Sequence, residues 1–345
     1  MEAKQTKTLR PFVDALEIGD PIGHQNLTLV PLRGGGHGRL DYLLAQEAIS
    51  SGQLTVTEIS EGGSVPELLA INSGEKMILL LDGEELVGAK QNRILNTSVL
   101  LPARSKTKIP VSCVEQGRWR HNSPDFKSGH HSPSSLRARK SRDVTRNLQT
   151  VGEARSNQGA VWDAVEENVV LYQAAAPTMA MSDVYEQRQN LFEAYVNALK
   201  YPADARGVVV AVGGKLVAVD LFDKPATLKS IWSRLVTGYA VDAAARAKKE
   251  GEKDKPFTAK GASTLMEHIG EIVCQPCPSV GIGEDWRFEA PDILGQALVV
   301  QEQCVHLSVF PNEFPGEDEG RGPGILPPSR RRANCGGRPG GEIVY

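Results

Sequence analysis

The sequence has no long apolar segment. No run approaches the roughly 18 apolar residues that a membrane-spanning helix needs. The first residues, MEAKQTKTLRPF, also lack the apolar core of a secretory signal. These two absences exclude a helical membrane protein at the level of sequence. We therefore expect a cytoplasmic protein with no membrane partner.

Cysteine is scarce, and neither sign of charge is in large excess. Five cysteines in 345 residues are an odd number spread over a long chain, which does not fit a disulfide framework. The formal net charge of -3, with 23% charged residues, gives no overall attraction to nucleic acid or acidic membranes. A hydrophobic content of 40% is enough to build real cores. The composition predicts an ordinary globular protein with reduced thiols.

Residues 27–119 consist mostly of short apolar runs separated by Gly, Pro and Asn, such as LTLVPL, MILLLDG and ILNTSVLLP. Runs rich in Val, Ile, Leu and Thr that are broken at turn residues are typical of strands in an antiparallel sheet or barrel. One helix is expected inside this region, at residues 42–50, where apolar residues recur at helical spacing. This part of the chain is therefore predicted to be β-rich.

Residues 132–201 predict three helices. The first, SPSSLRARKSRDVTRNLQ, has only a thin apolar stripe, so we expect its burial to be shallow. The second is NQGAVWDAVEENVVLY, with apolar residues near helical spacing. The third is expected to begin at a Ser182 cap and to end at Pro202. The helices separate the first set of strands from a second set.

Residues 206–310 return to strands. GVVVAVGGKLVAVDLF predicts a hairpin with its tight turn at Gly213 and Gly214, and helices and four late strands follow it. Residues 311–345 are rich in Gly, Pro and Arg, which predicts a disordered tail. We expect an α+β fold in which a β-rich antiparallel sheet or barrel has a helical middle insertion and returning C-terminal strands. Residues 1–310 would form one composite domain.

The stretch LDGEELVGAKQNRILN, residues 81–96, carries many ionic and amide side chains within a predicted strand pair. The alternation of side chains along a strand cannot place all of them in solvent, so some face inward. A buried Arg or Lys is stable only when it is paired and hydrogen-bonded. Two interpretations stay open: a buried ion-pair network that fixes strand register, or a preorganised pocket for an anionic ligand.

A second polar cluster, VSCVEQGRWRHN, adds an Arg beside a Trp, which together can clamp an anionic, planar ligand. The alternative is a Trp packed on the core with its Arg reaching water. In the pocket interpretation, a glutamate acts as general base or binds a divalent ion, and the candidates are Glu85 and Glu115. The remaining candidates bind the ligand through phosphate contacts, amide hydrogen bonds or stacking: Lys90, Gln91, Asn92, Arg93, Asn96, Arg118 and Trp119.

Three other features have weaker patterns. One CxxC followed by Cys-x-His has the elements of a zinc site, but without a second well-spaced pair it assigns no metal, and no cofactor is assigned. Its residues are Cys274, Cys277, Cys304 and His306. The glycine-rich residues 33–39 lack the GK[ST] ending of a phosphate-binding loop and are predicted to be flexible. Cys113, on a predicted strand, is interpreted as a small buried residue rather than a nucleophile.

Residues 117–155 form the one strongly basic stretch, with nine Lys or Arg against three Asp or Glu. Such a stretch is typical of a phosphate-backbone contact, so RNA is a weaker candidate partner. The alternative is a solvated basic face, which we favour.

The segments LDGEELVGAKQNRILNTSVLLP and IPVSCVEQGRW resemble the prokaryotic ARG and Rhodanese-Phosphatase-superfamily-associated protein family. GVVVAVGGKLVAVDLF and VHLSVFP resemble further segments of the same domain, so the resemblance covers residues 27–310. It implies nucleotide- or ADP-ribose-related metabolism, because members are grouped by association with ADP-ribosylglycohydrolase and with rhodanese or phosphatase proteins. The positions carried over are Glu85, Lys90, Gln91, Asn92, Arg93, Glu115, Arg118 and Trp119.

The leading hypothesis is a nucleotide- or ADP-ribose-directed protein, a hydrolase or transferase whose Lys/Arg/Glu/Asn pocket takes a small phosphate-bearing ligand. The alternative is a non-catalytic sensor or adaptor that uses the same pocket only to bind. The sequence does not decide between an enzyme and a binding protein, and it gives no oligomeric state.

Overall fold

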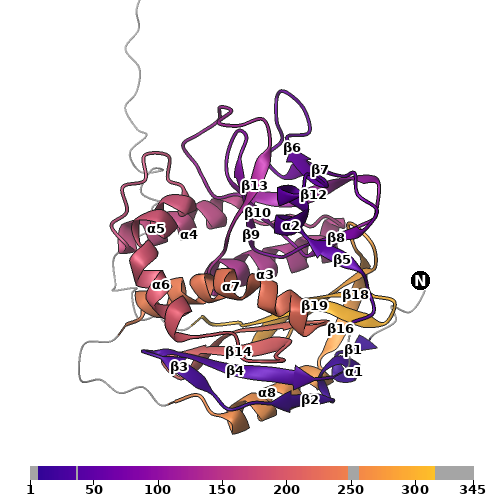
Figure 1. Cartoon of the computed structure of the whole chain (residues 1–345), viewed down its shortest axis with the longest axis vertical. Coiled ribbons are helices and arrows are strands. Elements are labelled where there is room, and N and C mark those ends of the chain that lie inside the picture. The colour runs from indigo at the N-terminus through magenta and orange to yellow at the C-terminus, as the bar shows by residue number, and fades with distance from the viewer. Residues whose placement is uncertain (1–6, 36–37, 248–255, 315–345) are drawn as a thin grey trace, which may run out of the picture.

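The computed structural model describes residues 7–35, 38–247 and 256–314. The fold is α+β, with a large antiparallel sheet, two smaller sheets and helices between them (Figure 1). The predicted tail is residues 311–345, and all of it except residues 311–314 lies outside the described residues. Within the described part of the chain, no helix is both long and apolar enough to cross a membrane.

The large sheet has ten strands drawn from both ends of the chain. They are β1 (Lys7–Thr8), β2 (Leu16–Ile18), β3 (Ile22–His24), β4 (Leu27–Gly34), β14 (Gly207–Val212), β15 (Lys215–Phe222), β16 (Val273–Pro278), β17 (Glu284–Glu289), β18 (Ile293–Val300) and β19 (Gln303–Pro311). Their order is β1-β16-β17-β18-β19-β15-β14-β4-β2, with β3 beside β4. The returning C-terminal strands therefore complete a sheet that the N-terminal strands begin.

The two smaller sheets use most of residues 42–131. Their strands are β5 (Tyr42–Leu44), β6 (Leu54–Thr57), β7 (Glu67–Asn72), β8 (Met77–Leu80), β9 (Glu84–Gly88), β10 (Arg93–Leu95), β11 (Val99–Leu101), β12 (Ser105–Cys113) and β13 (Phe126–His131). The six-stranded sheet has the order β13-β9-β10-β12-β7-β6, and the three-stranded sheet has the order β11-β8-β5. The helix predicted at residues 42–50 begins as strand β5, because these residues pair in parallel with β8, and becomes helical only at α2 (Ala45–Ser50).

Helices lie between the large sheet and the smaller sheets and also on the outer face of the large sheet (Figure 1). The inner set is α3 (Ser134–Val151), α6 (Gln189–Ala198) and α7 (Pro225–Ala245), together with α4 (Gln158–Leu171) and α5 (Met181–Gln187), which lie beside the smaller sheets. The outer helices are α1 (Arg10–Val13) and α8 (Ala259–Glu271). One apolar core fills the space around the inner helices, a second lies under α1 and α8, and a third lies within the smaller sheets.

The hairpin predicted from the Gly-Gly pair is confirmed. Gly213 and Gly214 have φ of +59° and +76°, and the strands on either side pair from Val212 and Lys215. Positive φ at both turn positions is the geometry that two glycines permit at no steric cost.

The single helix predicted from Ser182 is wrong, because the chain forms α5 and α6 with a break at Arg188. Ser182 does not cap a helix. The N-cap is Ala180, and the Ser182 hydroxyl accepts a hydrogen bond from Asn92 Nδ2 at 3.1 Å instead. A contact with a distant part of the chain thus overrides the local capping preference.

A buried ionic network connects α3 with the smaller sheets on one side and the large sheet on the other. The Arg137 guanidinium donates to both carboxylate oxygens of Asp220 on β15 at 2.6 and 2.9 Å. Its Nε also donates to Asp82, which lies just before β9, at 3.3 Å. All three side chains are fully buried.

Lys140, one turn further along α3, completes this network. Its ammonium donates to Asp82 and to the carbonyl of Asn96. Burial raises the pKa of Asp82, but the charges of Lys140 and Arg137 outweigh burial and lower it below its usual value. The shallow burial predicted for this helix is therefore wrong, because its buried face uses charged side chains that a search for apolar spacing does not detect.

Replacing Arg137 with Met should lower the free energy of unfolding by about 3–5 kcal/mol, because it leaves the buried Asp220 carboxylate without its arginine and removes one of the two cations that pair with Asp82. Chemical denaturation of the two proteins measures this difference. Arg104 is a matched control, since its side chain is 71% exposed and pairs with Glu75 at the surface. Arg104→Met should cost less than about 1 kcal/mol. Equal costs at the two positions would contradict a supporting role for the network.

Candidate functional site

The motif at residues 81–96 folds into β9, a turn over residues 89–92, and β10. In the antiparallel register, Arg93 pairs with Leu86 and Ile94 pairs with Glu85. Paired side chains lie on the same face of a sheet and successive side chains on opposite faces. Arg93 and Glu85 therefore point to opposite faces, and the structure divides the predicted site residues into two groups.

Arg93 lies in the first group, which we call the Arg93 cluster: Glu58, Lys90, Arg93 and Trp119. The Arg93 side chain is fully buried, and its Nη1 donates to Gln91 Oε1 at 3.0 Å. Its Nε and Nη2 have no hydrogen-bond partner within the described residues, and neither does Glu58 Oε2. Glu58 Oε1 lies 3.8 Å from Arg93 Nη2, too far for a hydrogen bond. The cluster thus holds a buried cation with unused donors.

Trp119 forms the outer side of the Arg93 cluster. Lys90 Nζ and Arg93 Cζ lie 5.4 and 5.6 Å from the centre of its ring. The Trp119 side chain is 47% exposed and Arg118 only 9%, so Trp119 does not pack on the core with Arg118 reaching water. The connection between β6 and β7 covers the cluster, since a Cβ on Gly63 would lie 3.1 Å from Lys90 Cδ.

Arg118 and Glu115 form a closed pair beside this cluster. Arg118 donates to the two Glu115 oxygens at 2.8 and 2.7 Å, and its other N–H groups reach backbone carbonyls and Asn92 Oδ1. Glu115 also accepts from the Thr178 hydroxyl and the Asn92 backbone N–H. Burial raises the pKa of Glu115, but the bonds from Arg118 outweigh it and lower the pKa. This part of the motif has the geometry of a buried salt bridge.

The predicted amides also bind within the protein. Asn92 donates to Ser182 on α5, and its Oδ1 accepts from the Gly88 N–H at 3.1 Å. Asn96 donates to the Ala154 carbonyl at 3.1 Å, and its Oδ1 accepts from the Ser112 hydroxyl at 2.7 Å. The Asn92 contact holds the β9–β10 turn against α5, and the Asn96 contact holds the end of β10 against the loop after α3.

Glu85 belongs to the second group, on the other face of the sheet. It is 1% exposed, its Oε2 accepts from the His130 N–H at 3.4 Å, and its Oε1 has no hydrogen-bond partner among the described residues. Burial raises the pKa of Glu85 to about 8, and the charge of Glu115 contributes further to the increase. A carboxyl group with such a pKa suits general acid–base chemistry near neutral pH.

Sequence analysis missed Glu58, which directly follows β6 and faces Arg93 only because β6 and β10 belong to the same six-stranded sheet. It also missed a chain of hydrogen bonds from Ser98 to His306 at 2.6 Å and from His306 to Asp220 at 3.3 Å. These are the residue types of a hydrolase triad. All three are at most 3% exposed, and Asp220 is already held by Arg137, so they belong to the interior network.

The four residues considered for zinc do not converge. Within the described residues, no three His, Cys, Asp or Glu side chains are grouped so that they would hold a metal ion. Burial in the apolar core raises the pKa of Cys274 and of Cys304 to about 12, and His306 faces Ser98 and Asp220. Cys113 is fully buried, and burial raises the pKa of its thiol to about 11.

The basic residues at 117–155 do not form one open surface. Arg118, Arg137 and Lys140 are buried in ion pairs. Arg146 is exposed but pairs with Glu289 at 3.1 Å. RNA binding by this stretch stays a prediction, and fewer of its basic residues are exposed than the sequence suggests.

Replacing Glu85 with Gln should stabilise the protein at alkaline pH. The pKa of Glu85 in the folded chain, about 8, exceeds the ordinary 4.5, so its contribution to stability is fully present below the unfolded pKa and is lost as pH rises through the folded pKa. Gln mimics the neutral form. As the pH rises from the ordinary pKa of 4.5 to above about 8, the parent should lose stability through this group and Glu85→Gln should not. The free energy of unfolding of Glu85→Gln relative to the parent should therefore rise by at least about 1.4 kcal/mol between these two pH values. The exposed Glu271→Gln serves as control, and a pH-independent difference would contradict the assignment.

One family model matches most of the chain. It is the ARG and Rhodanese-Phosphatase-superfamily-associated Protein domain, and the match covers residues 15–310. Neither a curated protein nor a solved structure matches this chain significantly. The matched residues include both smaller sheets, the inner helices and nearly all of the large sheet. The chain therefore belongs to the ARG and Rhodanese-Phosphatase-superfamily-associated Protein family.

Proposed function

We propose that this protein binds a small phosphate-bearing ligand of the nucleotide or ADP-ribose type at the Arg93 cluster. One observation carries the proposal: the fully buried Arg93 has two donor nitrogens, Nε and Nη2, without a hydrogen-bond partner among the described residues. A buried guanidinium with unused donors is costly, and a phosphate or carboxylate that accepts from both relieves that cost.

The charges around Arg93 support an anionic ligand. Two cations, Arg93 and Lys90, lie against the Trp119 ring, and the Glu58 carboxylate faces Arg93. Glu58 lies 3.8 Å from Arg93 Nη2, so it screens the charge without satisfying the donor geometry. Phosphate oxygens that meet both free N–H groups would form charge-assisted hydrogen bonds, which are stronger than neutral ones. Arg118 has its donors bound within the protein, so we assign it a positioning role.

Trp119 supports a ligand with a planar group. Lys90 and Arg93 already lie over the Trp119 ring, yet 47% of the residue is exposed. An exposed indole beside buried cations can stack a nucleobase while the cations hold the phosphate. The association with ADP-ribosylglycohydrolase proteins that the family resemblance implies is consistent with such a ligand.

Calorimetric titration with ADP-ribose, NAD, ADP and AMP tests this proposal. Arg93→Lys keeps the charge but loses the planar fork, and it should weaken binding by about 1.5–3 kcal/mol. Trp119→Ala should cost about 1–3 kcal/mol of binding. Exposed Arg104→Lys is the control and should leave binding unchanged. If Arg93→Lys and Trp119→Ala bind these ligands as the parent does, the proposed site is wrong.

Catalysis by hydrolysis or transfer is a second candidate, favoured by one observation at Glu58. Its Oε2 is buried, without a partner in the described residues, and lies beside Arg93, so it is placed to accept a proton from an attacking group. Glu85 faces away from Arg93, and Glu115 has both oxygens occupied.

Chromatography of the same ligands after incubation separates catalysis from binding. If the protein is an enzyme, Glu58→Gln should lose turnover and retain ligand binding. Stoichiometric binding without product would instead identify a sensor or adaptor and remove the catalytic hypothesis.

A further inference from the structure

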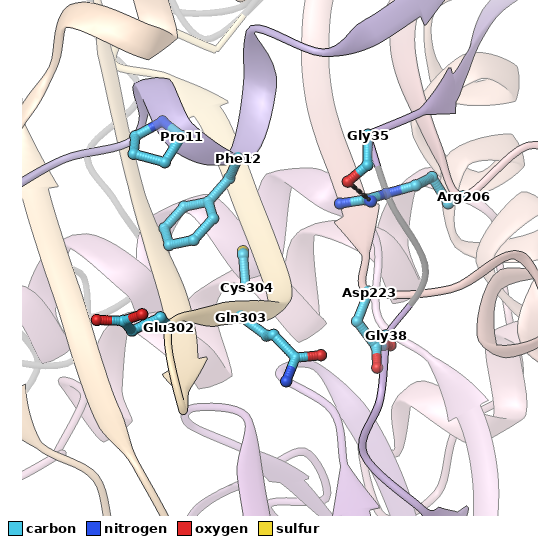
Figure 2. Close-up of a pocket in the computed structure, with 9 residues that line it drawn as sticks. All are labelled: Pro11, Phe12, Gly35, Gly38, Arg206, Asp223, Glu302, Gln303 and Cys304. Carbon is cyan, nitrogen blue, oxygen red and sulfur yellow. Dashed lines mark hydrogen bonds between the residues drawn. The ribbon is translucent and has the colours of Figure 1, made fainter.

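Arg93 lies under a cover, so a ligand reaches it only if part of the chain moves. The side chain is fully buried, and its unused donors have almost no accessible surface. A cavity of about 140 Å³ at one end of the large sheet offers no route, since none of the residues that line it belongs to the smaller sheets (Figure 2). Access to Arg93 therefore depends on the segment that covers it.

The cover is the connection from β6 to β7, whose residues 59–65 we call the lid. Both of its ends are held. Glu58, just before it, accepts from the Lys90 backbone N–H at 3.4 Å, and the Pro66 carbonyl, just after it, accepts from the Val111 N–H at 2.9 Å. None of the lid residues is buried. A surface segment with few buried contacts belongs to the least stable part of a fold, so it can open while its ends stay in place.

Gly63 is the point where the lid rests on the cluster. A Cβ built at Gly63 would lie 3.1 Å from Lys90 Cδ and 3.2 Å from Trp119 Cζ2. It would also lie 3.3 Å from Glu58 Oε2, so the lid backbone lies against three of the four members of the cluster. The φ of Gly63 is +76°, and its N–H donates to the Ser60 carbonyl at 2.9 Å. Glycine permits both this φ and this close approach.

Lys90 supplies the hydrogen bond that holds the lid closed. Its ammonium donates to the Glu61 carbonyl, and no other hydrogen bond joins residues 59–65 to the rest of the described chain. The same ammonium lies over the Trp119 ring, as Arg93 does. A charged phosphate oxygen is a stronger acceptor than a neutral carbonyl oxygen. A phosphate that enters the cluster therefore competes for the group that holds the lid.

We propose that the lid opens to admit the phosphate-bearing ligand to Arg93, and that Lys90 controls the opening by exchanging the Glu61 carbonyl for a phosphate oxygen. The identity of the ligand rests on the proposed function. Opening itself is a property of the free protein, because the contact between Lys90 and Glu61 breaks and forms again without any ligand. The lid and the ligand can therefore be tested separately.

Cys113 is a natural reporter of opening. It pairs with Arg93 in the register of β10 and β12, so the two side chains lie on the same face of the sheet. Burial raises the pKa of its thiol to about 11, and the nearby charges of Arg93 and Glu58 shift that pKa in opposite directions. Because Cys113 is fully buried, iodoacetamide reaches it only when the lid or the whole fold opens. Cys274, fully buried in the large sheet, reports the whole fold, whereas Cys304 lines the cavity in Figure 2.

Alkylation of the full chain with iodoacetamide, followed by peptide mass spectrometry, measures opening without ligand. Lys90→Met removes the ammonium and keeps an apolar stem, so Cys113 should react at least about tenfold faster than in the parent, with Cys274 unchanged. Lys76→Met is the control, since the Lys76 side chain is 49% exposed and pairs with Asp41 at the surface. It should change neither rate. An unchanged Cys113 rate in Lys90→Met, or an equal rise at Cys274, would overturn the proposal.

A second variant acts on the lid itself. Gly63→Ala adds a methyl group at a φ of +76°, against Lys90 and Trp119, and so disfavours the closed lid. It should raise the Cys113 rate at least about fivefold. Gly52→Ala is the matched control, because its φ is +71° and nothing lies within 4 Å of the added Cβ. Equal Cys113 rates in these two variants would contradict the lid, and if Lys90→Met or Gly63→Ala fails to fold, the other decides.

Saturating ADP-ribose separates the lid from the proposed function. Bound ligand occupies the cluster, so it should slow alkylation of Cys113 in the parent at least about tenfold and leave Cys274 unchanged. Faster alkylation in the lid variants, without protection by ADP-ribose, would support the lid and contradict the proposed ligand. Calorimetric binding of ADP-ribose, with alkylation of both lid variants at the parent rate, would instead support the ligand and overturn the lid.

Discussion

The buried ion pairs of Arg137 with Asp82 and Asp220 hold the layers of this protein together. Arg137 lies on α3, Asp82 precedes β9, and Asp220 lies on β15, so one guanidinium connects the smaller sheets, the helical layer and the large sheet. Because these charges and the Lys140 ammonium that also pairs with Asp82 are fully buried, each is stable only while its partners stay in place. The relative position of the layers, and with it the motif that carries the Arg93 cluster, depends on this constraint.

The motif at residues 81–96 serves two purposes. Asp82 at its start and the pair of Arg118 and Glu115 beside its turn have their hydrogen-bonding capacity satisfied inside the protein. Arg93, between them, retains donors without a partner among the described residues. A rigid, closed frame around one unsatisfied cation is the arrangement expected of a preorganised anion site, since neighbours that are already paired cannot move to satisfy that cation.

Local patterns were sufficient for much of the fold. The Gly213-Gly214 turn, the late strands and the α+β class follow from turn chemistry and short-range periodicity, which act over a few residues. The burial of α3 did not follow, because charged residues such as Lys140 read as solvent-facing until their buried partners are known. Strand β5 and the break at Arg188 depend on pairing and packing with distant segments.

The sequence by itself determined that an unusual density of charge had to be buried near residues 81–96, since strand alternation leaves no way to expose it all. Only the tertiary structure decided which charges neutralise one another. Strand register sent Glu85 and Arg93 to opposite faces, and the fold brought Glu58 to Arg93 from another part of the chain. Ion pairing acts over a few ångströms in space, and no local sequence pattern encodes which distant residues come that close.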